Sequence, residues 1–484
     1  MTKKVRVRYA PSPTGFLHIG NTRTALMNFL FAKHYDGSFI IRVEDTDFER
    51  NIDGALESQF SNLDWLKITH DESYLKPNKI YGEYIQSKKI DRYYKLANQL
   101  IENGFAYKCY CSHEDLEIEK ERQIENGVTA PLYSGKCRNI SKKINDKEFS
   151  IRFKVPKNKE FIINDIVRNK IVFNSSEIGD FVIVKSNKVA TYNFAVVVDD
   201  YDMKISHVIR GEEHISNTPK QLMIFEALSW NNPIFCHLTL IVDDSKKKLS
   251  KRSPNALFFI EEYKNKGYLP EAVFNYIALL GWSPKNEQEI YSIEELINIF
   301  TENNFSKSPS TFDMNKMKWF NSQWMKLIDE KKYLNEVKNF IDYERFNFDK
   351  KNALFNKILL LFKNEIDYFS QINNHLDIFT DNKKVDSETI NFFEPFKTHS
   401  NEMIHTFLHE LEIINDFSED IIKSLIKNMG EKFSLKGKSL FMPIRMAVTK
   451  TWHGPELAKT ILYIGKEASI RNVCNFIKEV WGGK

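Results

Sequence analysis

The sequence of 484 residues has no long hydrophobic run. No uncharged apolar stretch approaches the roughly 20 residues that a membrane-crossing helix needs. The N-terminal segment MTKKVRVRYAPSPTG carries positive charge, but it enters an alternating pattern without the apolar core and cleavage site of a signal peptide. We therefore expect neither membrane insertion nor export.

Cysteine is scarce as well, with 5 residues in the whole chain. So few cysteines cannot form the dense disulfide framework of a small secreted domain, and a cytoplasmic location is expected. An excess of one charge sign is also missing, because 69 Lys and Arg residues stand against 65 Asp and Glu residues. A net charge of +4 permits an RNA partner without demonstrating one.

The N-terminal half carries an α/β pattern. Val5, Val7 and Tyr9 alternate with two arginines, which predicts a strand, and APSPTG then ends it. The segment TRTALMNFLFAK predicts a buried helix with Asn21 as its N-cap, and SFIIRVED predicts a second strand. Strand, helix and strand in this order predict parallel pairing and the start of a doubly wound nucleotide-binding sheet.

The rest of the chain changes character twice. Residues 105 to about 190 contain short strand-like pieces such as SIRFKV and DFVIVKS between polar turns, which predicts an inserted α+β domain. The crossover pattern then resumes with the strand ISHVIR, the helix TPKQLMIFEALSW and the strand IFCHLTLIV. Beyond residue 255 apolar residues recur at helical spacing, as in Met403, Ile404, Phe407 and Leu411. A chain of this length exceeds one hydrophobic core, so several domains are expected.

The segment PSPTGFLHIGN lies between the first strand and the buried helix. Ligands of a parallel sheet gather beyond the carboxyl ends of its strands, and the free N–H groups of a helix N-terminus attract phosphate there. His18 can donate a hydrogen bond to phosphate oxygens as negative charge develops, and Gly20 allows the backbone to approach a nucleotide. The alternative is that His18 only packs in the loop.

A basic segment, KKKLSKR, follows the last strand expected in this sheet. A basic run is usually a solvated surface. At the carboxyl edge of a nucleotide-binding sheet, however, Lys248 and Lys251 can reach a triphosphate and neutralise the charge that grows on departing pyrophosphate. Its position therefore favours a binding loop.

Arg8 and Arg210 end two of the expected strands, so both should project into the crevice where the strand order reverses. An arginine binds a carboxylate through two parallel hydrogen bonds, a geometry that a neutral amide cannot satisfy equally. The two residues therefore favour a ligand with a carboxylate side chain. The alternative is that they pair with Glu44, Asp45 or Asp47.

These segments resemble the signatures of class I aminoacyl-tRNA synthetases. PSPTGFLHIGN is similar to their HIGH motif, with Asn21 in place of the second histidine, and KLSKR is similar to their KMSKS loop. RVRYAPSPTG, RVEDTD and TYNFAVVVDDYDMKISHVIRGEEHISNTPKQ resemble the glutamate and glutamine branch. MNKMKWFNSQWM and FMPIRMAVTKTWHGPELAKTILYIGKE resemble the bacterial glutamate enzymes, whose anticodon-binding region is helical.

The resemblance implies a Rossmann-like, doubly wound α/β core that is interrupted by an inserted α+β domain and followed by an all-α anticodon-binding region. The two catalytic halves are expected at residues 1–104 and 191–255, with the tRNA acceptor-binding insert at 105–190. A helical stem-contact domain is expected at 256–328 and the anticodon-binding region at 329–484.

The resemblance also implies a reaction and its site residues. ATP activates L-glutamate to glutamyl-adenylate, which is transferred to the 3′-terminal adenosine of tRNA(Glu), with His18, Lys248 and Lys251 as catalytic residues. Mg²⁺ is expected to arrive with ATP. The residues expected to bind ATP are Pro11, Thr14, Gly15, His18, Gly20, Asn21, Ser250, Lys251 and Arg252. Those expected to bind glutamate are Arg8, Ser12, Glu44, Tyr192 and Arg210, with Glu44 on the ammonium group and core filling as the alternative role of Tyr192.

Three cysteines of the insert occupy the place where some bacterial relatives hold a structural zinc through three cysteines and a histidine. They are Cys109, Cys111 and Cys137, and Asn139 stands at the histidine's position. Zinc normally takes four ligands, so His113 or a water molecule would have to complete the set. Zinc therefore stays an open alternative.

Asp199, Asp200 and Asp202 form an acidic segment that could suggest a metal site. Their spacing does not repeat a calcium loop, and we expect an acidic turn with a structural role.

The expected partners are L-glutamate and tRNA(Glu), with tRNA(Gln) as a further or alternative substrate, and the resemblance suggests a monomer. A base-modifying relative is disfavoured, because such proteins lack the long helical C-terminal region. From a different class, the chain could be a catalytically silent tRNA-binding protein. The joint presence of His18, Glu44, Arg210 and Lys251 disfavours that alternative.

Overall fold

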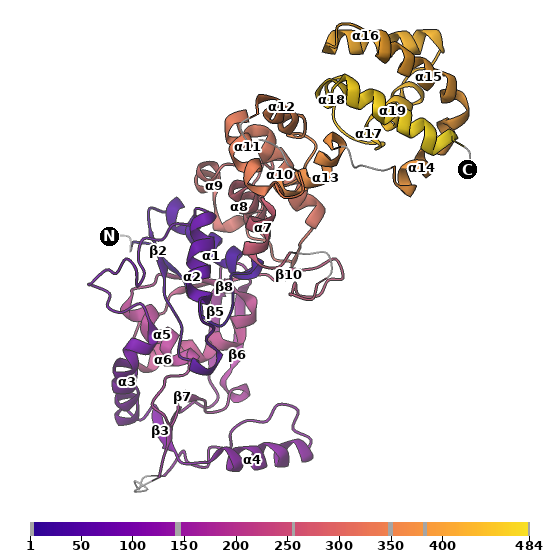
Figure 1. Ribbon diagram of the computed structural model, residues 1–484. Helices are drawn as coiled ribbons and strands as arrows, with labels where there is room; N and C mark the ends of the chain where they lie inside the picture. The colour runs from indigo at the N-terminus through magenta and orange to yellow at the C-terminus, as the bar shows by residue number, and fades with distance from the viewer. Residues whose placement is uncertain (1–3, 141–146, 254–256, 347–351, 381–384, 483–484) are drawn as a thin grey trace. The chain divides into compact units, whose positions relative to one another are not determined.

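The computed structural model describes residues 4–140, 147–253, 257–346, 352–380 and 385–482 (Figure 1). The chain forms two compact units. The first comprises Met1–Glu262 with Val273–Met314, and the second comprises Tyr263–Ala272 with Asn315–Lys484. Within the described residues, the first unit carries the strands and the second is helical.

The chain opens with the expected strand, helix and strand. Strand β1 (Arg6–Tyr9) pairs in parallel with β2 (Ser38–Ile41), and both strands are buried along their whole length. Helix α1 (Ile19–His34) connects them and buries most of its residues, as its nearly continuous apolar sequence predicts. The predicted N-cap was wrong: the helix begins at Ile19, and the cap is His18 rather than Asn21.

A four-stranded sheet has the order β6-β5-β9-β8. Its strands are β5 (Glu160–Asp165), β6 (Asn169–Asn174), β8 (His207–Gly211) and β9 (Ile234–Leu238). Strands β8 and β9 are parallel, and α6 (Thr218–Ala227) connects them. Strand β1 lies beside β8, where the amide of Ser206 donates to the carbonyl of Arg6 at 2.9 Å. The strand order therefore reverses between β1 and β8, and a crevice is expected at their carboxyl ends.

The apolar run IFCHLTLIV forms two strands instead of the one expected. After β9 the chain leaves this sheet, and β10 (Ile241–Val242) pairs in parallel with β11 (Ser310–Thr311). A continuous apolar run cannot show such a break, because both strands are buried and need no alternation.

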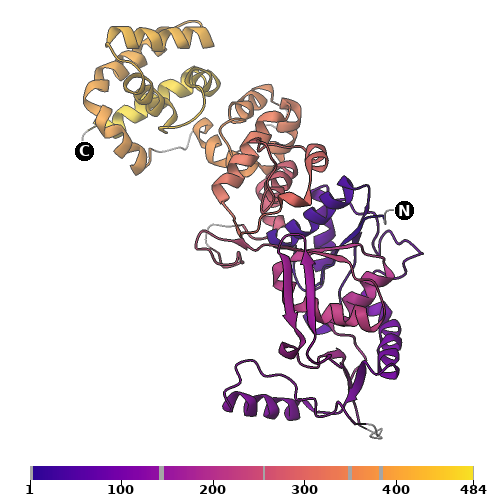
Figure 2. The ribbon, with the colours of Figure 1, turned by 180° about the vertical axis from the view of Figure 1, so that it is seen from behind.

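The inserted segment contributes to two sheets. Strands β3 (Ala106–Cys109), β4 (Ser150–Phe153) and β7 (Val182–Val184) form an antiparallel sheet, with α4 (His113–Glu125) following β3. The β5–β6 hairpin, drawn as two long arrows in Figure 2, joins the catalytic sheet because β5 pairs with β9. The insert is therefore anchored in the sheet that it interrupts.

Further helices of the catalytic half pack beside the sheet. Helices α3 (Ile90–Glu102), α5 (Tyr192–Asp202) and α6 share a core that includes Tyr93, Phe153, Phe194 and Phe225. The predicted acidic turn is in fact the last turn of α5. The other helices that lie wholly or partly in this unit are α2 (Ala55–Trp65), α7 (Ile260–Lys266), α8 (Pro270–Ala278), α9 (Ile293–Ile299) and α10 (Met314–Leu327).

The second unit contains two helical cores. One includes Tyr333, Phe355 and Phe362, and the other includes the periodic residues Met403 and Phe407, which are fully buried as expected. Its helices are α11 (Glu330–Val337), α12 (Ala353–Leu361), α13 (Ile372–His375), α14 (Ser387–Phe393), α15 (Lys397–Ile413), α16 (Glu419–Lys432), α17 (Lys438–Thr449), α18 (Leu457–Ile464) and α19 (Lys466–Trp481).

The order of α/β sheets followed by helices agrees with the expected fold class, while the bounds of the five expected segments stay a prediction. Across the part of the chain that is described, no helix has both the length and the apolar character needed to cross a bilayer.

Candidate active site

A cavity of about 490 Å³ opens at the carboxyl ends of β1 and β8. All five residues expected to bind glutamate line it: Arg8, Ser12, Glu44, Tyr192 and Arg210. The loop after β1 and the first turn of α1 add five of the residues expected to bind ATP, which are Pro11, Thr14, Gly15, His18 and Asn21. The topology explains this convergence, because the strand ends meet where the strand order reverses.

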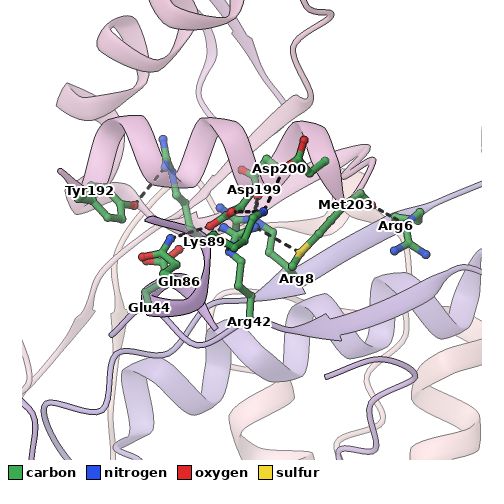
Figure 3. Close-up of polar contacts among 12 residues, drawn as sticks. Arg6, Arg8, Arg42, Glu44, Gln86, Lys89, Tyr192, Asp199, Asp200 and Met203 are labelled. Carbon is green, nitrogen blue, oxygen red and sulfur yellow. Dashed lines mark hydrogen bonds and ion pairs between the residues drawn. The ribbon is translucent and has the colours of Figure 1, made fainter. Parts of the chain in front are cut away.

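A buried ionic network holds one side of the cavity (Figure 3). Arg42, which follows β2 and is 1% exposed, donates to Glu44 at 3.1 Å and to Asp200 at 2.7 Å. Arg8 donates to the same Asp200 at 3.1 Å. The alternative that Arg8 pairs with Glu44, Asp45 or Asp47 was therefore wrong, because its carboxylate partner comes from α5.

The network sets the charge of both carboxyl groups. Burial alone would raise the pKa of Asp200, but Arg8 and Arg42 outweigh it and hold that pKa below its ordinary value. Burial raises the pKa of Glu44 despite the opposing effect of Arg42 and Arg8. A further cation in the cavity would stabilise the ionised form of Glu44, and the ammonium group of a ligand can supply that charge.

Arg210 is bound differently, because it has no carboxylate within ion-pair distance among the described residues. It is 4% exposed, and its Nε donates to His237 Nε2 at 3.2 Å. Its Nη2 donates to the hydroxyl of Thr218 at 2.8 Å, and Nη1 lies 3.5 Å from the hydroxyl of Tyr192. A buried guanidinium held by neutral acceptors is left to find its counter-charge in a ligand.

Tyr192 lies at the first residue of α5 and packs partly against the core while also lining the cavity. Its hydroxyl contacts His214 Nδ1 at 3.3 Å. Tyr192 therefore contributes to the core and to the cavity wall, while its binding of glutamate stays a prediction.

His18 caps α1 with its side chain. Its Nδ1 accepts from the amides of Gly20 at 3.1 Å and Asn21 at 3.3 Å, and the amide of Ile19 donates to Phe258. The first-turn amides are therefore engaged, which corrects the expectation that they are free for phosphate. Because Nδ1 accepts, the proton of the neutral ring is on Nε2.

The surroundings of His18 fix the ring. It stacks on Phe258 with centroids 4.8 Å apart. A Cβ at Gly20 would lie 3.2 Å from the ring, so glycine gives the imidazole its room. Burial and the charge of Lys248 lower the pKa of His18 to about 4. The imidazole is therefore neutral near pH 7.

A second cavity of about 380 Å³ shares His18 and Asn21 with the first. Gly20, Lys248 and Ser250 also line it, and the ammonium of Lys248 lies 3.8 Å from a carboxylate oxygen of Glu213. The two sequence-distant segments are thus brought together at one place.

Lys251 and Arg252, which were predicted to bind ATP, line neither cavity. The ammonium of Lys251 lies 5.9 Å from the ring centroid of Phe259, whose backbone bridges to His18. Arg252 is exposed, and its amide donates to Ser250 Oγ at 3.3 Å.

The three aspartates of α5 have basic partners. Asp199 contacts Arg42 and Lys89, and Asp202 contacts Lys89 and Arg92. Their structural role agrees with the expectation.

The three cysteine sulfurs lie within 4.8 Å of one another. The hydroxyl of Tyr133 lies 3.4 Å from Cys109 Sγ and 3.6 Å from Cys111 Sγ, and it accepts from the amide of Cys137 at 3.0 Å. His113, exposed in the first turn of α4, does not belong to this group. Three thiols with one oxygen close to two of them supply four candidate ligand atoms, the number that a structural zinc ion takes.

Several residues of the site were missed from the sequence. Arg42 precedes Glu44 by two positions, so strand alternation places it on the same face. Glu213, His214 and Asn217 follow β8 and line the first cavity, as the rule that found Arg210 would have indicated. His237 gave no signal beyond its place in a strand.

The chain matches known families over nearly its whole length. Residues 4–319 match the family described as "tRNA synthetases class I (E and Q), catalytic domain", and residues 320–476 match "Anticodon binding domain". The glutamate–tRNA ligase of Mycoplasma capricolum is 57% identical over 476 residues, covering 97% of this chain and 98% of that protein. The glutamate–tRNA ligase of Bacillus subtilis is 47% identical, covering 98% of this chain and 100% of that protein.

A solved structure shows the same fold. It is a glutamate–tRNA ligase from Elizabethkingia meningosepticum in complex with its amino acid, with a TM-score of 0.87 and 32% identity over 99% of this chain and 100% of that one. These matches confirm the resemblance and the predicted fold class. The chain therefore belongs to the class I aminoacyl-tRNA synthetases of the glutamate and glutamine (E and Q) family.

Proposed function

We propose that the protein is a glutamate–tRNA ligase that activates L-glutamate with ATP and transfers it to tRNA(Glu) during protein synthesis. The observation that carries the proposal is a single cavity lined by Glu44, Arg8 and Arg210 together with His18. A glutamate zwitterion needs one anion for its ammonium group and cations for its side-chain carboxylate. The names of the relatives agree with this assignment.

The amino-acid pocket would hold glutamate by charge. Glu44 and Ser12 would bind the ammonium end, while Arg8 and Arg210 would bind the side-chain carboxylate. Arg8 already forms an ion pair with Asp200, which it shares with Arg42, whereas Arg210 has no carboxylate partner among the described residues. Arg210 is therefore the stronger candidate for discriminating a carboxylate from an amide.

Activation would occur where the two cavities meet. The α-carboxylate attacks the α-phosphorus of ATP, and pyrophosphate leaves in line with the attack. His18 would donate from Nε2 to the oxygens of the α-phosphate, and Lys248 and Lys251 would stabilise the pyrophosphate. Lys248 would exchange its contact with Glu213 for phosphate.

The other residues expected to bind ATP line one of the two cavities or lie in the basic loop beside them. They are Pro11, Thr14, Gly15, Gly20, Asn21, Ser250 and Arg252. The described residues hold no cluster of three carboxylates here. Mg²⁺ would therefore bind mainly through the phosphates and neutralise their charge.

The second step would transfer the glutamyl group to the terminal adenosine of tRNA, with the 2′-OH as the nucleophile that the class I family implies. The helical second unit, which matches an anticodon-binding domain, would bind the anticodon. Charging of tRNA(Gln) is a finer prediction that the experiment below distinguishes.

The test is aminoacylation of purified tRNA(Glu) and tRNA(Gln) with glutamate and with glutamine, together with glutamate-dependent exchange of pyrophosphate into ATP in the presence of tRNA. We expect glutamyl-tRNA(Glu) and exchange. Charging of tRNA(Gln) as well would identify a non-discriminating enzyme. Binding of tRNA without exchange or charging would refute the proposal and indicate a catalytically silent protein.

We also propose that Cys109, Cys111, Cys137 and Tyr133 hold a structural zinc ion. The sulfur positions and the hydroxyl oxygen between them support this ligand set. Zinc would fix the base of α4 against β3 and has no role in the chemical steps. A cytoplasmic location and a monomeric state stay predictions from the sequence.

A further inference from the structure

Arg210 lies against a buried histidine that the proposed mechanism does not use. His237 in β9 is 0% exposed, and its Nε2 receives the hydrogen bond from Arg210 Nε at 3.2 Å. The Nε of an arginine always carries a hydrogen, so His237 Nε2 must act as the acceptor. The proton of the neutral imidazole is therefore on Nδ1.

Asp165 holds His237 in that tautomer. Its Oδ2 lies 2.7 Å from His237 Nδ1, and it also accepts from the backbone amide of His237 at 3.1 Å. The amides of Val167 and Arg168 donate to Asp165 Oδ1 at 2.9 Å and 2.8 Å. The carboxylate is thus fixed by backbone and orients the ring rather than moving with it.

The hydrogen bonds from Asp165 through His237 to Arg210 connect the insert with the amino-acid pocket. Asp165 ends β5 of the inserted hairpin and pairs with Phe235 of β9, while Arg210 lies on β8. The guanidinium of Arg210 also lies 5.5 Å from the ring centroid of Phe235. The direction of this guanidinium therefore depends on a residue outside the sequence motifs of the active site.

We propose that His237, held by Asp165, is a positioning residue that aims Arg210 at the side-chain carboxylate of glutamate and so determines its selection over glutamine. The inference rests on the proposed function. Because Nε and Nη2 are occupied by His237 and Thr218, Nη1 is presented toward the cavity, where its hydrogen-bond contact among the described residues is Tyr192 at 3.5 Å. A guanidinium that rotates freely would lose the fixed direction of this N–H donor, which favours a charged carboxylate over a neutral amide.

Two substitutions of His237 separate positioning from folding. In His237→Asn the amide replaces Nδ1, so the contact with Asp165 is kept and the acceptor for Arg210 is lost. In His237→Gln the longer side chain places an oxygen near the former Nε2, so the acceptor for Arg210 is kept. We expect His237→Asn to raise KM for glutamate by about ten- to hundredfold, the equivalent of one charge-assisted hydrogen bond.

The same variant should lower the preference for glutamate over glutamine while KM for ATP stays near the wild-type value. His237→Gln should recover most of the glutamate affinity. The matched control is His207→Asn, a half-buried histidine at the start of β8 that should leave both KM values unchanged. Melting temperatures of all three variants are measured alongside.

An unchanged KM for glutamate in folded His237→Asn, or equal losses for glutamate and ATP in both His237 variants, would overturn the proposal. If His237→Asn does not fold, Asp165→Asn replaces it, because an amide can donate to Nδ1 and so allow the other tautomer. That variant should also raise KM for glutamate, and no change would again overturn the proposal. Wild-type protein that fails to activate glutamate would instead refute the proposed function.

Discussion

Arg8 and Arg42 donate to the same oxygen of Asp200, at 3.1 Å and 2.7 Å. The two arginines come from neighbouring strand ends, and the carboxylate comes from α5. Because Arg42 also contacts Glu44, one buried chain of charges connects the cationic and anionic ends of the amino-acid pocket. The pocket is therefore held in shape before a ligand arrives.

Replacing Asp200 with asparagine should damage both stability and binding. The change leaves two buried arginines without their shared counter-charge, so the free energy of unfolding should fall by about 3–5 kcal/mol. Asp202→Asn is the matched control on the same helix, because Asp202 and its partner Arg92 are partly exposed and its buried partner Lys89 keeps Asp199, so it should cost only about 1 kcal/mol. Urea unfolding of both variants checks this, and equal losses would contradict the role of the network.

Lys251→Ala should lower glutamate-dependent pyrophosphate exchange by about 10²–10³-fold, as expected for one group that stabilises transition-state charge. Affinity for tRNA should change little. Lys247→Ala is the control within the same loop, because Lys247 is an exposed lysine like Lys251 but was not predicted to contact ATP. Filter binding of tRNA and exchange rates are compared for the two variants. Similar exchange rates would remove Lys251 from the proposed mechanism.

The sequence could predict where the strand ends meet, but not how the side chains there are paired. Alternation and glycine or proline punctuation located β1, α1 and β8, because local spacing reflects burial directly. Arg8 and Arg210 followed from their positions at strand ends. The partner of Arg8, Asp200, lies 192 residues away in the sequence, and no local pattern reports such a contact.

The errors have the same origin. Asn21 was expected to cap α1 because asparagine is a common N-cap. Instead, the side chain of His18 accepts hydrogen bonds from the first-turn amides, and Asn21 lies inside the helix. A histidine that caps through Nδ1 is outside the usual propensities. Similarly, Tyr133 lies beside the cysteines although no spacing rule for zinc includes a tyrosine at that position.

The cysteine group should bind one zinc ion per chain in purified protein. Tyr133→Phe removes the oxygen and should weaken zinc by at least about tenfold in competition with a chelator. Cys111→Ser should weaken it further. Cys474→Ser, which changes a cysteine on α19, should behave as wild type. Absence of zinc from the wild type, or equal retention in Tyr133→Phe and Cys474→Ser, would refute the ligand set.

The double use of the His18 ring gives the sharpest test of its catalytic role. Nδ1 caps the helix, whereas Nε2–H is the group proposed to reach phosphate. In His18→Asn the side-chain oxygen can replace Nδ1 as the cap, but no donor remains at the position of Nε2. We expect kcat for exchange to fall by about 10²–10³-fold with little change in melting temperature. His18→Ala should lose about 1 kcal/mol of stability in addition.

The pH dependence of the wild type provides an independent check. Burial and Lys248 lower the pKa of His18 to about 4, so the active neutral ring persists as the pH falls from 8 to 5. The pyrophosphate exchange rate of the wild type at saturating substrate should therefore show no inflection near pH 6.5 that comes from His18. Its pH profile in this range should have the same shape as that of His18→Asn. Glu44, whose pKa is raised by burial, must be ionised to bind the ammonium group, so KM for glutamate should rise at the acid end of this range. An inflection in kcat near pH 6.5 that His18→Asn abolishes would show that the ring is protonated in the working enzyme, and the neutral-donor assignment would fail.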